Sequence, residues 1–208
     1  MKLIPAIDLK NNKVVLAKNG SRDKYIEIPK NIAPSSSPIA FIKHLLSFHH
    51  FSTIYLADLD SINIFNSYGN KINEIISTYK HINFIIDNGV NNYSQINIYE
   101  GTNYKQIIGT ETYIEYKKLQ NNTTTKYILS LDYKNNAILS KNNEYTMLKP
   151  SDVICMSIDN IGTLNGPSYK NLESTKKLYP NSNIIVSGGL RNMEDLFKLR
   201  EKGYNDII

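Results

Sequence analysis

The sequence of 208 residues predicts an α/β fold, and it favours a (β/α)8 barrel over an open doubly wound sheet. Short apolar, β-branched runs recur along the chain, and each is followed by turn residues and then by a segment with helical spacing. The runs are continuously apolar rather than alternating, which is typical of strands covered on both faces. Eight such runs occur, and eight is the strand number of a closed barrel.

The expected elements alternate between strand and helix in chain order. We predict strands at residues 3–7, 53–57, 82–86, 105–108, 126–131, 153–156, 183–186 and 206–208. Helical spacing predicts helices at residues 38–49, 70–79, 93–100, 168–179 and 193–202. Ser37 before Pro38 is typical of a helix start, with an N-cap residue preceding proline at the first helical position. Residues 135–145 predict a hairpin inserted after the fifth strand.

We expect residues 1–208 to form one domain. The polar stretch at residues 33–38 is too short for a domain linker and indicates a loop after the first strand. The eighth strand falls at the end of the sequence, and no eighth helix follows it. The eighth strand–helix unit of the barrel is therefore expected to be truncated or incomplete in this chain.

The composition excludes several classes of protein. Hydrophobic residues make up 41% of the chain, which is too much for a disordered protein. The net charge is +5, from 24 Lys and Arg against 19 Asp and Glu, but the basic residues form no stripe, so we expect no nucleic-acid partner. The single cysteine, Cys155, allows no intramolecular disulfide and no cysteine-based zinc site. With no apolar stretch long enough to span a bilayer, we expect a cytoplasmic protein without a membrane partner.

Polar residues end most of the apolar runs, where a parallel barrel places its reactive groups. These residues are Asp8, Asp58 with Asp60, Asp87, Gly109-Thr110, Asp132, Ser157 and Ser187-Gly188-Gly189. Asp8 and Asp132 follow the first and fifth strands, which lie on opposite sides of a barrel mouth, and a buried charge there is costly unless it has a purpose. This pair suits one general base and one general acid acting on two faces of a ligand. Asp58 and Asp60 are expected to order the loop after the second strand.

Glycine-containing loops after two strands suggest phosphate binding. Ser187-Gly188-Gly189-Leu190, with Arg191, follows the seventh strand and opens a helix, where backbone N–H groups can approach an anion. An ordinary tight turn is the alternative. Gly109-Thr110 and Asn88-Gly89 could form a second anion site across the mouth.

Six motifs in order resemble the HisA/HisF family of histidine-biosynthesis barrels. They are Ile4-Pro5-Ala6-Ile7-Asp8-Leu9-Lys10, Ala57-Asp58-Leu59-Asp60, Ile108-Gly109-Thr110, Leu131-Asp132, Gly162-Thr163-Leu164-Asn165-Gly166-Pro167 and Ser187-Gly188-Gly189-Leu190. Ala6 favours the HisA branch, and the resemblance covers essentially the whole chain.

The resemblance implies a (β/α)8 barrel that catalyses an Amadori rearrangement of an aminoaldose phosphate to an aminoketose phosphate. It places the general base at Asp8 and the general acid at Asp132. It also implies a substrate with a phosphate at each end, bound by loops after strands three and four and after strands seven and eight, and it implies no metal or organic cofactor. The residues expected to bind substrate or phosphate are Gly109, Thr110, Ser157, Gly162, Thr163, Ser187, Gly188 and Gly189.

The chain departs from the family pattern at three places. Asp87-Asn88-Gly89-Val90-Asn91 stands where the family has a Gly-Gly-Gly-Ile-Arg-like phosphate loop, so a carboxylate that would repel phosphate replaces a glycine. Met156-Ser157 replaces a Thr-Asp pair, and the strand-eight phosphate loop is missing from the sequence. Residues 20–25, 35–38 and 54–60 are similar to HisA-like paralogues of C1-metabolising microbes. This similarity implies a substrate diverged towards tetrahydromethanopterin-linked metabolism, and a singly phosphorylated substrate is one expectation.

Two alternatives stay open. One is a genuine histidine-pathway ribotide isomerase that tolerates the rewritten loop. The other is a non-catalytic barrel that binds a phosphorylated metabolite, although retention of Asp8 and Asp132 argues against it. The sequence leaves the oligomeric state open.

Overall fold

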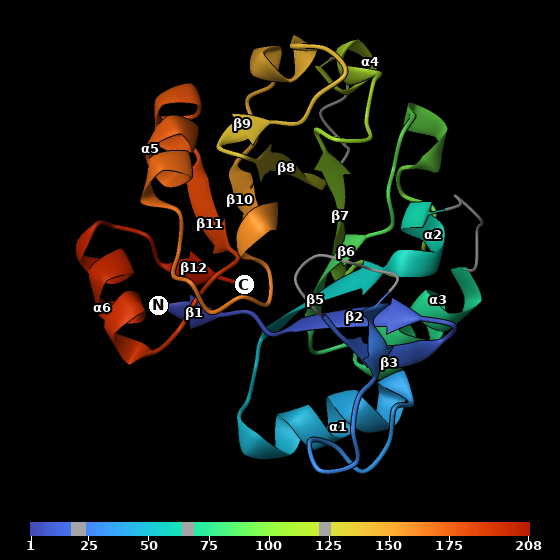
Figure 1. The fold of residues 1–208 in the computed structure, drawn as a ribbon. Helices are drawn as coiled ribbons and strands as arrows, with labels where there is room; N and C mark the ends of the chain where they lie inside the picture. Colours follow the sequence, from blue (N-terminus) through green and yellow to red (C-terminus); the bar gives the residue numbers. More distant parts are fainter. Residues whose placement is uncertain (18–23, 64–68, 121–125) are drawn as a thin grey trace.

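The computed structural model describes residues 1–17, 24–63, 69–120 and 126–208. Of the motif at residues 20–25, positions 20–23 therefore lie outside the described residues. The chain folds into a (β/α)8 barrel that ends in a short eighth strand, with helices outside a curled sheet (Figure 1). No helix among the described residues is long and apolar enough to cross a membrane.

The strands of the described chain are β1 (Lys2–Leu3), β2 (Ala6–Lys10), β3 (Lys13–Leu16), β4 (Ile26–Glu27), β5 (Thr53–Asp58), β6 (Asn83–Asp87), β7 (Tyr104–Gly109), β8 (Tyr127–Lys134), β9 (Ala137–Ile138), β10 (Asp152–Ser157), β11 (Asn183–Ser187) and β12 (Asp206–Ile207). The helices are α1 (Pro38–Phe48), α2 (Leu59–Asn63), α3 (Gly69–Thr78), α4 (Tyr116–Gln120), α5 (Tyr169–Leu178) and α6 (Met193–Glu201). Short 3-10 turns occur at η2 (Tyr93–Gln95), η3 (Glu144–Met147) and η4 (Ile158–Asn160).

Hydrogen bonds close the barrel through its first strand. β1 pairs in parallel with β12, and β2 pairs in parallel with β5, so the first strand bridges the last and the second. Pro5, between β1 and β2, has no N–H to donate, but its carbonyl accepts from the N–H of Tyr55 at 3.0 Å. The sheet order from β12 through β11, β10, β8, β7, β6 and β5 to β2 is parallel throughout. Because β12 has only two residues, the eighth unit is incomplete, as predicted.

Side-chain alternation along the strands separates two layers of core. Tyr55, Ile85, Ile107, Ile154 and neighbouring side chains fill the barrel interior. Residues of opposite parity pack outward against the helices, in one cluster under α1 and α3 and another under α5 and α6. Cys155 belongs to the outer layer and is buried, which raises the pKa of its thiol to about 11. It is the inert, small apolar side chain that its position in the strand predicts.

One predicted helix is wrong. Residues 93–100 form only the short turn η2 instead of a helix. Asn92 and Gln95 cap this turn reciprocally, and Asn97 then adopts a left-handed backbone with φ of 59°. The N–H of Asn97 donates to the side-chain carbonyl of buried Gln106 at 2.5 Å. The N–H of Asn97 therefore donates to a side chain of β7 instead of to a carbonyl within a helix.

Two hairpins extend the parallel barrel. The predicted hairpin exists, but it is shorter than 135–145, because β9 pairs antiparallel with the end of β8 across Asn135 and Asn136. A second hairpin, which the sequence analysis did not predict, joins β2 to β3 across Asn11 and Asn12. All four asparagines have positive φ angles, from 52° to 59°, and asparagine tolerates this conformation better than most residues. The second hairpin brings Val15 of β3 to the mouth of the barrel.

Candidate active site

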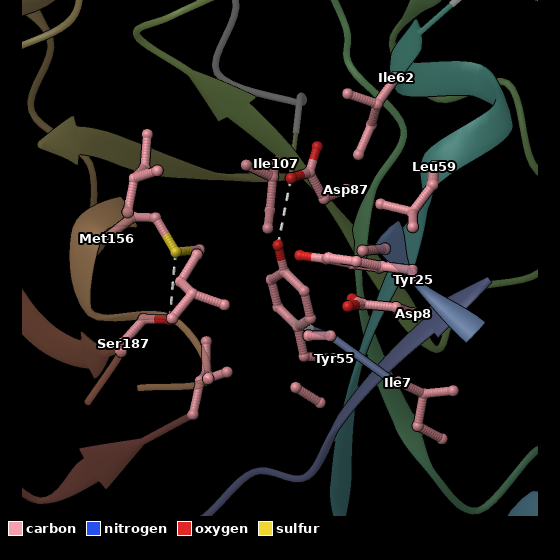
Figure 2. A pocket seen from close by; sticks show the side chains of 18 of the residues that line it. Ile7, Asp8, Tyr25, Tyr55, Leu59, Ile62, Asp87, Ile107, Met156 and Ser187 are labelled. Carbon is pink, nitrogen blue, oxygen red and sulfur yellow. Dashed lines mark hydrogen bonds between the residues drawn. The ribbon is translucent and has the colours of Figure 1, made fainter. Parts of the chain in front are cut away.

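A cavity of about 840 Å³ opens where the parallel strands end, and side chains from opposite walls point into it (Figure 2). Seven of the ten residues predicted for the site line this cavity: Asp8, Gly109, Asp132, Gly162, Ser187, Gly188 and Gly189. Thr110, Ser157 and Thr163 are not among the lining residues, and their side chains bond within the chain, to the Asp132 N–H, to Asn171 and to the Asn160 carbonyl. Most of the residues predicted from strand ends therefore converge on one cavity.

Asp132 lies near the end of β8 and is 8% exposed. Its Oδ1 accepts from the hydroxyl of Ser130 at 2.7 Å, and its Oδ2 accepts from the N–H of Glu111 at 3.0 Å. A Cβ atom on Gly109 would lie 2.9 Å from Oδ2, so a glycine at that position leaves room for the carboxylate. These contacts fix the orientation of Asp132 at the cavity wall.

Burial raises the pKa of Asp132 from an ordinary value of 3.8 to about 7. The hydrogen bonds from Ser130 and Glu111 favour the ionised form, but loss of hydration outweighs them, and the charges of Asp87 and Glu111 act in the same direction as burial. A carboxyl group with this pKa holds a proton for a substantial fraction of the time near pH 7, as a general acid must.

Asp8 faces the cavity from the opposite side. It lies in β2, beside Ala57 of β5 and Val15 of β3, and it is half-buried. β5, β6 and β7 separate β2 from β8 in the sheet, so Asp8 and Asp132 approach a ligand from different walls. Figure 2 shows the Asp8 side chain pointing into the cavity next to Tyr25. The placement agrees with one acidic and one basic group on two faces of a substrate.

A tyrosine that the sequence analysis did not single out stands between these walls. Tyr55 lies in β5, is 5% exposed, and donates its hydroxyl to Oδ2 of Asp87 at 3.1 Å (Figure 2). Burial, and then the charges of Asp87, Asp8 and Asp132, raise the pKa of Tyr55 well above its usual value. The hydroxyl therefore remains a donor. A signal was available, because Tyr55 shares the inward face of its strand with Ala57 just before the strand ends.

The loops after β10 and β11, the sixth and seventh strands of the barrel, meet through their backbones. Gly166 donates its N–H to the carbonyl of Gly189 at 2.7 Å. A Cβ on Gly189 would lie 2.2 Å from the Gly166 carbonyl oxygen, and one on Gly188 would lie 2.7 Å from the Ser157 carbonyl oxygen. Both Gly188 and Gly189 also have positive φ, so two independent constraints require glycine there. Gly188 and Gly189 thereby present backbone, rather than side chains, to the cavity.

Arg191 holds this pair of loops from outside. Its guanidinium donates two hydrogen bonds to Asp195 of α6, at 2.9 and 2.6 Å, and its N–H donates a third at 3.0 Å. Asp195 is fully buried, and a Cβ on Gly166 would lie 3.1 Å from the Arg191 guanidinium carbon. The arginine therefore packs against one loop while its partner anchors the other to a helix.

Asp58 orders the chain directly after its strand, as predicted, whereas Asp60 contacts the hairpin between β2 and β3. Both oxygens of Asp58 accept from Ser61, and Asp60 accepts from the N–H of Asn11 at 2.7 Å. Among the residues that the structure describes, no group of three or more His, Cys, Asp or Glu side chains is placed to hold a metal ion.

Comparison with known proteins agrees with this barrel fold. A family model described as "histidine biosynthesis protein" matches residues 2–208. The chain belongs to this family. An uncharacterized protein of Methanocaldococcus jannaschii is 33% identical over the whole chain and 91% of its own length.

Relatives with a named activity match over similar spans. A 1-(5-phosphoribosyl)-5-((5-phosphoribosylamino)methylideneamino)imidazole-4-carboxamide isomerase of Thermoanaerobacter is 29% identical over the whole chain and 92% of its own length. The isomerase of the same name from Buchnera aphidicola is 22% identical over 99% of this chain and 91% of its own. The family assignment made from six short motifs is thus confirmed.

Proposed function

We propose that this chain is an isomerase that converts a phosphorylated aminoaldose, as a sugar phosphate or ribotide, into the corresponding aminoketose. The observation that carries the proposal is the pair of carboxylates on opposite cavity walls, one of which, Asp132, has a pKa of about 7. Its named relatives are isomerases of a ribotide that carries two phosphoribosyl groups, which supports the same reaction class.

The first step opens the sugar ring. Protonated Asp132 donates its proton to the ring oxygen, the bond between that oxygen and C1 breaks, and the amino nitrogen forms a double bond with C1. Burial makes this transfer favourable near pH 7, because a carboxyl group with an ordinary pKa below 4 would almost never hold a proton there, whereas at a pKa of about 7 both forms are populated.

The second step moves a proton from carbon. Ionised Asp8 takes the proton at C2, and the electron pair of the C–H bond forms the enolamine. The enolamine then gains a proton at C1 and loses the hydroxyl proton at C2, which gives the ketose. Hydrogen is redistributed within one molecule, so the balance requires no external oxidant or reductant.

Phosphate binding is assigned in this proposal to the loops after strands six and seven. Gly162, Ser187, Gly188 and Gly189 line the cavity there, and glycine lets a phosphate approach the backbone closely. Arg191, which Asp195 holds, packs against Gly166 of the other loop. Ser157 and Thr163 would support these loops from behind rather than contact the substrate.

The identity of the substrate separates two candidates. Similarity to named isomerases along the whole chain favours the ribotide of histidine biosynthesis. The carboxylate of Asp87 at the cavity wall favours a diverged substrate. A link to tetrahydromethanopterin-dependent C1 metabolism and a cytoplasmic location stay predictions.

Calorimetric titration with the bisphosphorylated ribotide, alongside a turnover assay, tests the proposal. We expect an aminoketose product from this ribotide or from a singly phosphorylated analogue, and loss of the product in Asp132→Asn. Glu74→Gln is the matched control, because this exposed carboxylate lies on α3 outside the barrel. Tight binding of phosphorylated sugars without any turnover would contradict the proposal and favour a non-catalytic barrel.

A further inference from the structure

The loop after β6, the third strand of the barrel and here called the strand-three loop, is filled by a carboxylate of the chain itself. Oδ1 of Asp87 accepts from the N–H of Gly89 at 3.2 Å, while Oδ2 accepts from the Tyr55 hydroxyl at 3.1 Å. An anion thus already engages a glycine N–H and a hydroxyl donor that a phosphate in this loop could use.

In the neighbouring loop, after β7, the fourth strand of the barrel, the backbone N–H groups also donate hydrogen bonds within the chain. The N–H of Thr110 donates to the Ser130 carbonyl at 3.0 Å, and that of Glu111 donates to Oδ2 of Asp132. The next two N–H groups, of Thr112 and Tyr113, both donate to the carbonyl of Gly109. All four donors from residues 110–113 are therefore engaged within the chain, and one of them serves the proposed acid.

The strand-three loop has little room to rearrange around a larger anion. Gly89 has a φ of 67°, and a Cβ there would lie 2.7 Å from the Cα of Ile62 on α2. Tyr55 is held in the interior of the barrel by its strand. Asp87, Asp132 and Glu111 all line the cavity, and the charges of Asp87 and Glu111 act on Asp132, so a phosphate would also meet like charges.

We infer that Asp87 is a specificity-determining residue. Its carboxylate is an anion of the chain itself that excludes phosphate from the end of the cavity formed by the loops after β6 and β7. The inference rests on the proposed function and names its substrate class: an aminoaldose with one phosphate, held by the loops after strands six and seven, and with an uncharged group at the other end. A charged carboxylate discriminates here by repulsion as well as by occupying the donors.

The test is calorimetric binding of three ligands to wild type, Asp87→Ala and Asp87→Asn. The ligands are the bisphosphorylated ribotide and its two analogues that each lack one phosphate. We expect wild type to bind one analogue at least about tenfold more tightly than the bisphosphorylated ribotide, because like charges in contact are strongly unfavourable. Asp87→Ala frees the Gly89 N–H and should remove most of this preference.

Asp87→Asn separates the two causes of exclusion. It removes the charge but retains the volume and an acceptor for Gly89, so we expect a preference between those of wild type and Asp87→Ala. The wild-type preference needs no variant to interpret, so misfolding of Asp87→Ala would leave the test decisive. Thermal unfolding of each variant checks the fold.

Wild type that binds the bisphosphorylated ribotide as tightly as both analogues would overturn the inference, and so would an unchanged preference in Asp87→Ala. Neither result bears on catalysis, which is read from turnover by wild type and Asp132→Asn. Binding with the expected preference but without turnover would overturn the proposed function alone. Absence of binding by all three ligands would overturn both.

Discussion

The two halves of the barrel mouth differ in what lies beside the glycines of their loops. After strands six and seven, Gly188 and Gly189 bring backbone against backbone and leave no side chain of their own in the cavity. After strand three, Asp87 reaches back to Gly89 and to Tyr55 and fills its own loop with charge. A glycine after a parallel strand offers its N–H to an anion only where no group of the chain already engages it, and Asp87 already engages the N–H of Gly89.

The largest effect is expected from the residue that lies between these halves. Asp132→Asn removes the proton donor, and we expect kcat to fall by at least about a thousandfold, within the range known for general acid catalysis. Steady-state turnover of the accepted ribotide measures the change, with Glu74→Gln as the control. Turnover within tenfold of wild type would show that Asp132 is not the acid.

The same variant should not be less stable, which separates catalysis from folding. The pKa of Asp132 is about 7 in the folded chain and 3.8 as its ordinary value, so the folded state binds more protons between these values. Its contribution to stability is complete below pH 4 and is lost as the pH rises through about 7. The amide that replaces the carboxyl group does not ionise, so we expect Asp132→Asn to unfold at a temperature equal to or above that of wild type at pH 8.

One added methyl group should disrupt the contact between the loops after β10 and β11. Gly189→Ala places a Cβ 2.2 Å from the Gly166 carbonyl oxygen, so the two loops must separate. We expect a loss of phosphorylated ligand affinity of about a hundredfold or more, and a lower melting temperature. Gly203→Ala is the matched control, because its φ of 84° imposes similar backbone strain while nothing lies within 4 Å of the added Cβ. Equal effects of the two substitutions would contradict a role for the loop contact.

A smaller effect is expected from the contact that holds the two loops. Asp195→Asn weakens its pairing with Arg191, which packs against Gly166. We expect KM to rise by about tenfold while kcat stays near wild type, since charged hydrogen bonds contribute only a few kcal/mol. Glu194→Gln, an exposed neighbour that pairs with Lys198, is the control. An equal fall in kcat would mean that Asp195 acts beyond ligand positioning.

The smallest effect is a shift in pH dependence that links the halves. Because the reaction uses protonated Asp132, kcat should fall as the pH rises through about 7. The charge of Asp87 helps to raise the pKa of Asp132, so Asp87→Asn should move this limb to lower pH, by about one unit or less. Asp152→Asn, a carboxylate at the start of β10, is the control. A shift to higher pH would contradict the arrangement.

The sequence predicted the barrel because its strands carry their own signal. The run predicted at residues 53–57 lies in a strand, Thr53–Asp58, that is buried along its whole length. Asp8 and Asp132, which were predicted because they follow strands, both line one cavity. The predicted helix at residues 93–100 was wrong because Gln106, on a neighbouring strand, supplies a partner to Asn97 that no local pattern reveals.

The sequence could not show which backbone N–H groups of the loops already donate hydrogen bonds within the chain. The carboxylate of Asp87 already sets Asn88-Gly89 apart from Gly188-Gly189 in the sequence, but only the structure shows that this carboxylate accepts from the N–H of Gly89. Alternation along the strand could have placed Tyr55 on the inward face, but the sequence could not show that its hydroxyl reaches Asp87 on the neighbouring strand. Tertiary geometry therefore decides which loops are available to a ligand.

The measurement that tests the central claim most directly follows cleavage of the C2 bond to hydrogen, with a ribotide deuterated at C2. Wild type should release the deuterium from C2 as the aminoketose forms, and Asp8→Asn and Asp132→Asn should each suppress this release, while Glu74→Gln should not. Release of deuterium by Asp8→Asn at the wild-type rate would contradict the assignment of the two carboxylates as the acid–base pair of an isomerase.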